Sequence, residues 1–167
     1  MDNTFVEDDS FDNTVNISKE PNMDELVQSL KTVLANEYAF ALKAQNFHWN
    51  VEGMFFESFH SLFGRIYQEV YGSIDTFAEE LRALGTYAPS SLQRFSMLTQ
   101  IEDETQILPR QAMVESLIVD NEKTVKILKL VFQQSEANQE YGFSDFIASR
   151  IDAHRKHGWM LRASAKV

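Results

Sequence analysis

The chain contains no cysteine. This absence excludes disulfide bonds, thiolate metal sites and cysteine nucleophiles, and it is consistent with the cytoplasmic location that we expect. Long hydrophobic runs are also missing: no stretch approaches the roughly 18 consecutive apolar residues of a membrane-spanning helix. The opening residues, MDNTFVEDDSFDN, lack the basic start and apolar centre of a secretory signal. We therefore expect no membrane contact.

Positive charge is scarce: 15 lysines and arginines face 25 acidic residues, which gives a formal net charge of -10. A surface this acidic repels phosphate backbones, so the sequence predicts weak DNA binding or none. Residues 1–21 show no helical period, and we predict that they form a flexible acidic arm. The charged residues of this arm are Asp2, Glu7, Asp8, Asp9, Asp12, Glu20 and one base, Lys19.

The remaining residues, 22–167, show helical spacing of apolar side chains and no convincing strand. With 44% apolar residues, this length favours one domain with a sizeable core. Four long helices joined by one long connection predict an all-α four-helix bundle. Their expected bounds are about 23–50, 56–84, 110–135 and 145–164, with a short helix near Met97 in the connection 86–108.

Residues that start or stop helices mark these bounds. Asn22, with Glu25 three residues later, resembles a capping box at the start of the first helix. Gly85 stands where a C-terminal cap of the second helix is expected. Pro109 suits the first turn of the third helix, and Ser144 suits the N-cap of the fourth.

Two histidines and two acids within residues 46–81 indicate a metal site. A turn at Gly53 would let His48, near the end of the first helix, fold back towards His60 on the second helix. Asp75 and Glu79 follow on that helix, pointing about 60° and about 100° from His60 at 100° per residue.

One chain cannot complete this site, because Asp75 lies fifteen residues beyond His60. At about 1.5 Å per residue the two are roughly 22 Å apart, whereas metal–ligand bonds measure about 2 Å. Two antiparallel copies of the helix, related by a two-fold axis near Tyr67 or Gln68, would place His60 of one chain opposite Asp75 of the other. The sequence therefore predicts a symmetric dimer with two equivalent intersubunit sites.

A di-iron site inside one bundle is the alternative, and it requires Glu-x-x-His on each of two helices. The chain offers only Glu57-x-x-His60, which argues against that arrangement.

Ordinary structural roles compete with the metal hypothesis. Single helical histidines are often structural, and Asp75 and Glu79 could simply face solvent. His154 and His157 lie three residues apart on the last helix, where they could bind metal, although we favour solvated cations near the helix C-terminus. Core or interface aromatics are the expected roles of Trp49 and Trp159.

Three segments resemble one known family. NFHWNVEGMFFESFH, residues 46–60, resembles the His-Trp-Asn-x-x-Gly-x-x-Phe-x-x-x-His signature of the Dps family, the mini-ferritins. SIDTFAEELRALG, residues 73–85, resembles its Asp-x-x-Ala-Glu-x-x-x-x-Leu-Gly. IDAHRKHGWMLRA looks like the last helix of that family. The resemblance covers roughly residues 23–165.

The resemblance implies a ferritin-like bundle that assembles as a hollow dodecamer and oxidises Fe(II), preferentially with hydrogen peroxide, to store ferric mineral inside. It implies ferroxidase sites shared between subunits, with His48 and His60 from one chain and Asp75 and Glu79 from its partner. Trp49 would lie beside the site.

Asp145 matches a family position that lines three-fold pores, where converging carboxylates would admit Fe(II). The other interpretation is that Asp145 is an acid in the first turn of the helix, where its charge faces the helix dipole.

Two departures separate this chain from the family. Gly64 stands where an aspartate usually follows the second histidine by four residues, so one metal position lacks an oxygen ligand and would depend on water or Glu57. We expect slower or altered oxidation; the alternative is a non-enzymatic cage or architectural protein with a degraded site. The lysine-rich arm on which the family's DNA binding usually rests is also missing, and the C-terminus offers only Arg162 and Lys166.

Overall fold

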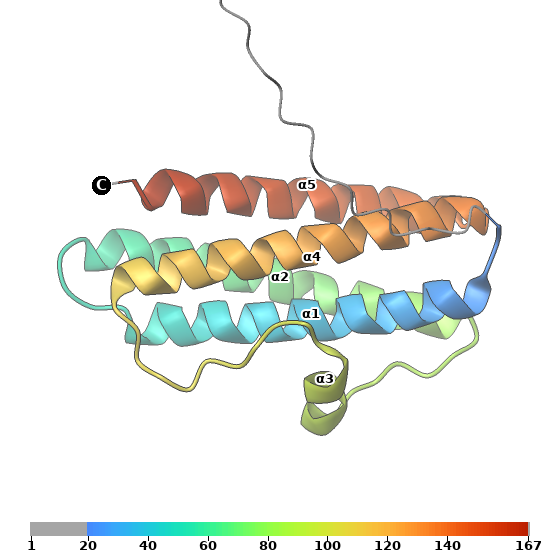
Figure 1. The fold of residues 1–167 in the computed structure, drawn as a ribbon, viewed down its shortest axis with the longest axis horizontal. Coiled ribbons are helices and arrows are strands. Elements are labelled where there is room, and N and C mark those ends of the chain that lie inside the picture. Colours follow the sequence, from blue (N-terminus) through green and yellow to red (C-terminus); the bar gives the residue numbers. More distant parts are fainter. Residues whose placement is uncertain (1–19, 167) are drawn as a thin grey trace, which may run out of the picture.

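The computed structural model describes residues 20–166, which form five α-helices and no strand. Their bounds are α1 Met23–Asn50, α2 Phe56–Ala83, α3 Leu92–Leu98, α4 Arg110–Ala137 and α5 Tyr141–Ser164. The antiparallel pair α1–α2 packs against the pair α4–α5, and the long connection that carries α3 runs back beside α1 (Figure 1). This confirms the predicted all-α four-helix bundle with a short extra helix. The predicted acidic arm, residues 1–21, lies outside the described residues except for its last two positions.

Three predicted helix ends are confirmed by the backbone. The side chain of Asn22 accepts a hydrogen bond of 3.2 Å from the Glu25 N–H, which caps the start of α1. Gly85 adopts the left-handed conformation at φ 81° just after α2, where a glycine is the least strained residue. Helix α4 begins directly after Pro109.

The start of α5 differs from the prediction. The helix begins at Tyr141 rather than about 145, because Gln139, in the left-handed conformation at φ 63°, reverses the chain within a very short turn. Ser144 therefore caps nothing. Its buried hydroxyl donates to the carbonyl of Glu140 at 3.1 Å and lies 2.8 Å from the hydroxyl of Ser135 on α4. Asp145 consequently lies in the second turn of α5 rather than at its start.

The core consists of two hydrophobic clusters, one near each end of the bundle. The cluster near the α1–α2 turn includes Phe40, Phe47, Phe63, Leu117 and Leu161. The cluster at the opposite end includes Leu26, Leu30, Phe77, Leu128 and Ile147. Between them lies a group of interacting polar side chains, which we call the polar layer: Glu37, Glu69, Asn121, Arg150, His154 and His157. None of the helices within residues 20–166 is long and apolar enough to cross a membrane.

Candidate metal centre

His48 and His60 meet where α1 turns into α2. Gly53 and Phe55 both adopt the left-handed conformation, at φ 87° and 65°, and together they reverse the chain within a few residues. The last turn of α1 therefore lies beside the first turns of α2. The two imidazole rings stack with their centroids 3.8 Å apart and their planes 23° from parallel. The structure thus shows the predicted return of His48 towards His60.

Each of these histidines is oriented by the backbone of the other. His48 Nδ1 lies 2.7 Å from the carbonyl oxygen of His60, and His60 Nδ1 lies 2.7 Å from the carbonyl oxygen of His48. A carbonyl oxygen only accepts hydrogen bonds, so each Nδ1 atom carries a proton, and a ring with no proton on Nε2 has a lone pair there that can bind a metal ion. Neither Nε2 atom has a hydrogen-bond partner between residues 20 and 166. Metal-binding histidines commonly donate their second N–H to a carbonyl in this way.

Gly64 lies directly under the His48 ring. A Cβ atom at this position would stand 3.0 Å from His48 Nδ1 and 3.1 Å from His48 Cε1. Gly64 is therefore more than a position that lacks a carboxylate, because its missing side chain also leaves the space in which the imidazole rests.

Two aromatic rings enclose the rest of the histidine pair. The Tyr67 ring centroid is 5.3 Å from that of His48, and the Phe56 ring stacks on His60 at 5.0 Å. Arg110, at the start of α4, donates to the carbonyl of Met54 at 2.5 Å and so ties the turn to the bundle. The positions of both imidazoles are thereby limited on several sides.

Asp75 and Glu79 lie on the exposed side of α2. Neither carboxylate makes a hydrogen bond or ion pair within the described chain. The next acid, Glu80, is crowded: burial, together with the charges of Glu140 and Glu79, raises its pKa. This end of α2 is therefore rich in negative charge and able to attract cations.

The histidine pair and the two acids do not meet within one chain. Within the described residues no cluster of three or more histidine, aspartate or glutamate side chains could hold a metal ion. Fifteen residues of continuous helix separate His60 from Asp75, which at about 1.5 Å per residue is roughly 22 Å. A site made from all four groups needs a second copy of α2.

The surface beside the histidine pair is apolar and accessible in the single chain. Trp49 is 65% exposed, and Trp159, on α5, is 63% exposed, so the core role considered for these tryptophans is wrong. Large exposed apolar side chains also follow along the α1–α2 turn: Met54, Phe55 and Phe56. Exposed apolar surface of this kind is typical of protein–protein contacts.

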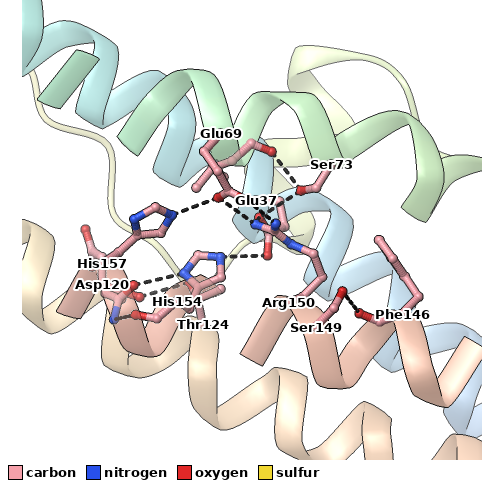
Figure 2. A network of polar contacts seen from close by, with 12 residues as sticks. Glu37, Glu69, Ser73, Asp120, Thr124, Phe146, Ser149, Arg150, His154 and His157 are labelled. Carbon is pink, nitrogen blue, oxygen red and sulfur yellow. Dashed lines mark hydrogen bonds and ion pairs between the residues drawn. The ribbon is translucent and has the colours of Figure 1, made fainter. Parts of the chain in front are cut away.

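The polar layer joins two histidine–glutamate pairs through one arginine (Figure 2). His154 Nε2 lies 3.0 Å from Glu37 Oε1, and His157 Nε2 lies 2.7 Å from Glu69 Oε2. Arg150 donates to both carboxylate oxygens of Glu69 and lies 3.7 Å from Glu37 Oε2. His154 is fully buried and His157 is 5% exposed, so the prediction that they are solvated cations is wrong.

Charge compensation in this layer is visible in two pKa shifts. Burial acts to raise the pKa of Glu69, but hydrogen bonds from His157 and Arg150, and their charges, outweigh it and lower the pKa to about 2. Burial acts to lower the pKa of Arg150, but Glu69 and Glu37 raise it by more. Arg150 is therefore a cation paired with two carboxylates, Glu37 and Glu69.

The sequence analysis did not identify the polar layer, although a signal was present. Glu37 shares the apolar stripe of α1 with Leu30, Val33 and Leu34, and Arg150 shares the stripe of α5 with Ile147. A charged residue within an apolar stripe points to a buried, paired charge.

Asp145 is exposed on α5 and makes no hydrogen bond or ion pair within the described chain. Its place in the second turn takes it out of the first turn, where a helix dipole acts most strongly. The dipole interpretation of Asp145 therefore loses support.

Comparison with known proteins shows the family. Residues 27–166 match the family model described as the ferritin-like domain. A DNA protection during starvation protein of Brevibacillus brevis is 30% identical over 142 residues, covering 82% of this chain and 95% of the relative. A low-temperature-induced protein of Nostoc, not functionally characterised, is 30% identical over 140 residues, covering 83% of this chain and 78% of the relative.

Solved structures agree with the sequence matches. A Dps protein from Bacillus brevis superposes with a TM-score of 0.82 at 28% identity, covering 86% of this chain and 97% of the other. The family model spans most of the chain, and the relatives found by sequence and by structure indicate the same family. The chain therefore belongs to the Dps family of ferritin-like proteins.

Proposed function

We propose that this chain forms a hollow dodecamer that takes up Fe(II), oxidises it with hydrogen peroxide at sites shared between subunits, and stores the ferric product inside. Ferrous iron and peroxide are the substrates, and iron is also the stored cargo. Removing both reactants prevents hydroxyl-radical formation. The name of the Brevibacillus relative, a DNA protection protein, supports a protective role.

The histidine pair carries this proposal. His48 and His60 each have Nδ1 satisfied by a backbone carbonyl, and their Nε2 atoms have no partner among residues 20–166. Asp75 and Glu79 are carboxylates without a hydrogen-bond or ion-pair partner in the described part of their own chain. Two imidazoles and two carboxylates form a donor set suited to Fe(II), and an antiparallel partner subunit would bring the two halves together.

The electron balance favours two ferrous ions for each peroxide. Each Fe(II) gives one electron, and hydrogen peroxide takes two electrons and two protons to become two molecules of water. A second ion would rely on water and on Glu57, which lies one helical turn before His60 on α2 and is exposed. A partly solvated second position predicts oxidation that is slower than a complete ligand set would give.

Subunit mixing tests the shared site. One variant carries His48→Ala and His60→Ala, and the other carries Asp75→Asn and Glu79→Gln. Each variant alone is expected to be inactive in peroxide-dependent Fe(II) oxidation, because every site lacks half of its ligands. A mixed dimer would contain one complete site and one empty site, so random 1:1 assembly is expected to restore about a quarter of the wild-type rate. Mixed cages as inactive as either parent would refute sharing between subunits.

A non-enzymatic cage is the second candidate, and Gly64 is the observation that favours it. A protein that kept the shell after losing iron chemistry would show the mass of a dodecamer but oxidise Fe(II) no faster than buffer. Oxidation measured by absorbance, together with sedimentation of the same sample, distinguishes the two candidates.

A further inference from the structure

We propose that Gly64 is a positioning residue of the candidate metal centre, whose missing side chain seats the His48 imidazole against α2. This inference rests on the proposed function, since it concerns how one of the proposed ligands is held. It gives Gly64 a role in ligand binding, in contrast to the interpretation that Gly64 marks a degraded site.

The argument begins with space. Gly64 is buried, and the Cβ of any other residue there would come within 3.0 Å of His48 Nδ1 and 3.1 Å of His48 Cε1. Non-bonded carbon atoms pack at about 3.5 to 4.0 Å, so contacts this short require the ring to move away from α2 by a few tenths of an ångström. The Cβ belongs to a helix backbone and cannot yield, which leaves the imidazole to shift.

Movement of the ring would disturb two contacts at once. The atom closest to the added Cβ, Nδ1 of His48, donates to the carbonyl of His60 at 2.7 Å. The same ring stacks on His60 with the centroids 3.8 Å apart. A displaced His48 has a longer and weaker hydrogen bond to the His60 carbonyl, which is the bond that fixes its tautomer. Loss of such a supporting hydrogen bond typically costs 10- to 100-fold in metal affinity.

The two interpretations of Gly64 make opposite predictions for Gly64→Asp. If the site is degraded, aspartate supplies a missing oxygen ligand and metal binds more tightly. If Gly64 positions His48, aspartate displaces the ring, and metal binds more weakly despite the added carboxylate. Gly64→Ala separates the two effects, because it adds the Cβ without adding a ligand.

Gly72 provides a matched control on the same helix. Within the single chain, a Cβ at Gly72 would meet nothing within 4 Å. Alanine favours the helix at both positions, so Gly64→Ala and Gly72→Ala should both leave the fold intact. Sedimentation of each variant confirms that its assembly matches that of the wild type before any metal is added.

The first measurement is independent of metal. Crystal structures of the metal-free wild type and Gly64→Ala are compared at His48. In the variant only, we expect the ring to move away from α2 by a few tenths of an ångström, and the distance from its Nδ1 to the His60 carbonyl oxygen to increase. An unmoved ring in Gly64→Ala overturns the proposal.

The second measurement is titration of each full-length assembly with Co(II), followed by visible absorption. We expect Gly64→Ala and Gly64→Asp to bind Co(II) about 10-fold more weakly than wild type or worse, and Gly72→Ala to bind as wild type does. Equal binding by Gly64→Ala, or tighter binding by Gly64→Asp, overturns the positioning role while leaving the site itself intact. A wild type that binds no Co(II) and oxidises no Fe(II) instead overturns the proposed function.

Discussion

His154 and Glu37, on α5 and α1, hold each other inside the bundle: Nε2 of the histidine lies 3.0 Å from Oε1 of the glutamate, and both side chains are fully buried. The carboxylate of Glu37 also receives the hydroxyl of Ser73 at 3.5 Å and lies near Arg150. A buried acid with several partners is costly to remove, because each partner then loses its compensation.

Substitution Glu37→Leu is therefore expected to destabilise the protein by about 3–5 kcal/mol, the usual cost of leaving buried charges unpaired. Urea unfolding at neutral pH measures this loss. Asp152→Ala is the control, since the Asp152–Arg155 pair is exposed and 3.7 Å apart, and such pairs contribute about 0–1 kcal/mol. Equal effects of the two substitutions would show that the polar layer does not support the fold.

Acid should weaken the protein through Glu69. The pKa of this glutamate is about 2 in the folded protein, below the ordinary value of 4.5. A lowered pKa stabilises the fold above the ordinary value, and that stabilisation is lost as the pH falls towards 2. Solvent screens part of the effect because Glu69 is partly exposed. We expect the melting temperatures of wild type and Glu69→Gln to differ most near neutral pH and to converge in acid; a constant difference would contradict this.

Asp145→Asn tests entry of iron. If three copies of Asp145 attract Fe(II) at a pore, neutralising them should slow iron uptake at low ionic strength by several-fold and matter less at high salt, because salt screens the attraction. Co(II) affinity and melting temperature should not change. Asp152→Asn removes an exposed acid from the same helix and serves as the control. An unchanged uptake rate in Asp145→Asn would refute the pore role.

DNA should not be retained by this protein at physiological salt. Binding of this kind depends on cationic side chains that displace counterions from phosphates, and the chain carries a formal net charge of -10 with an acidic N-terminal segment. A gel-shift titration with duplex DNA in about 0.15 M salt measures this directly. A shift at micromolar protein would refute the expectation.

The helix ends show why so much of the fold was predictable. The Asn22 cap, Gly85 and Pro109 act through local backbone chemistry, which is written in a few adjacent residues. Ser144 failed as a predictor because a serine that can cap a helix can equally pack against Ser135. The contact between α4 and α5, which only the folded chain contains, decided between these roles.

Only the part of the candidate site that depends on adjacent residues was predictable. His48 and His60 flank one tight turn, so their proximity follows from local geometry. The space at Gly64 depends on how closely the two helices approach, and the sequence shows only the missing carboxylate. The burial of His154 and His157 was not predicted because their partners, Glu37 and Glu69, lie on helices that are far away in the sequence and adjacent only in the folded chain.

The polar layer between the two hydrophobic clusters also fixes the axial register of the bundle. Apolar side chains can exchange partners when a helix slides by one turn, about 5.4 Å. Arg150 reaches both Glu37 and Glu69 at a single offset of α5 against α1 and α2, and any slide would leave charges unpaired. These contacts fix the position of α2 along the bundle axis in each subunit. Two copies of α2 packed antiparallel across a subunit boundary would therefore place the histidines of one copy opposite the acids of the other.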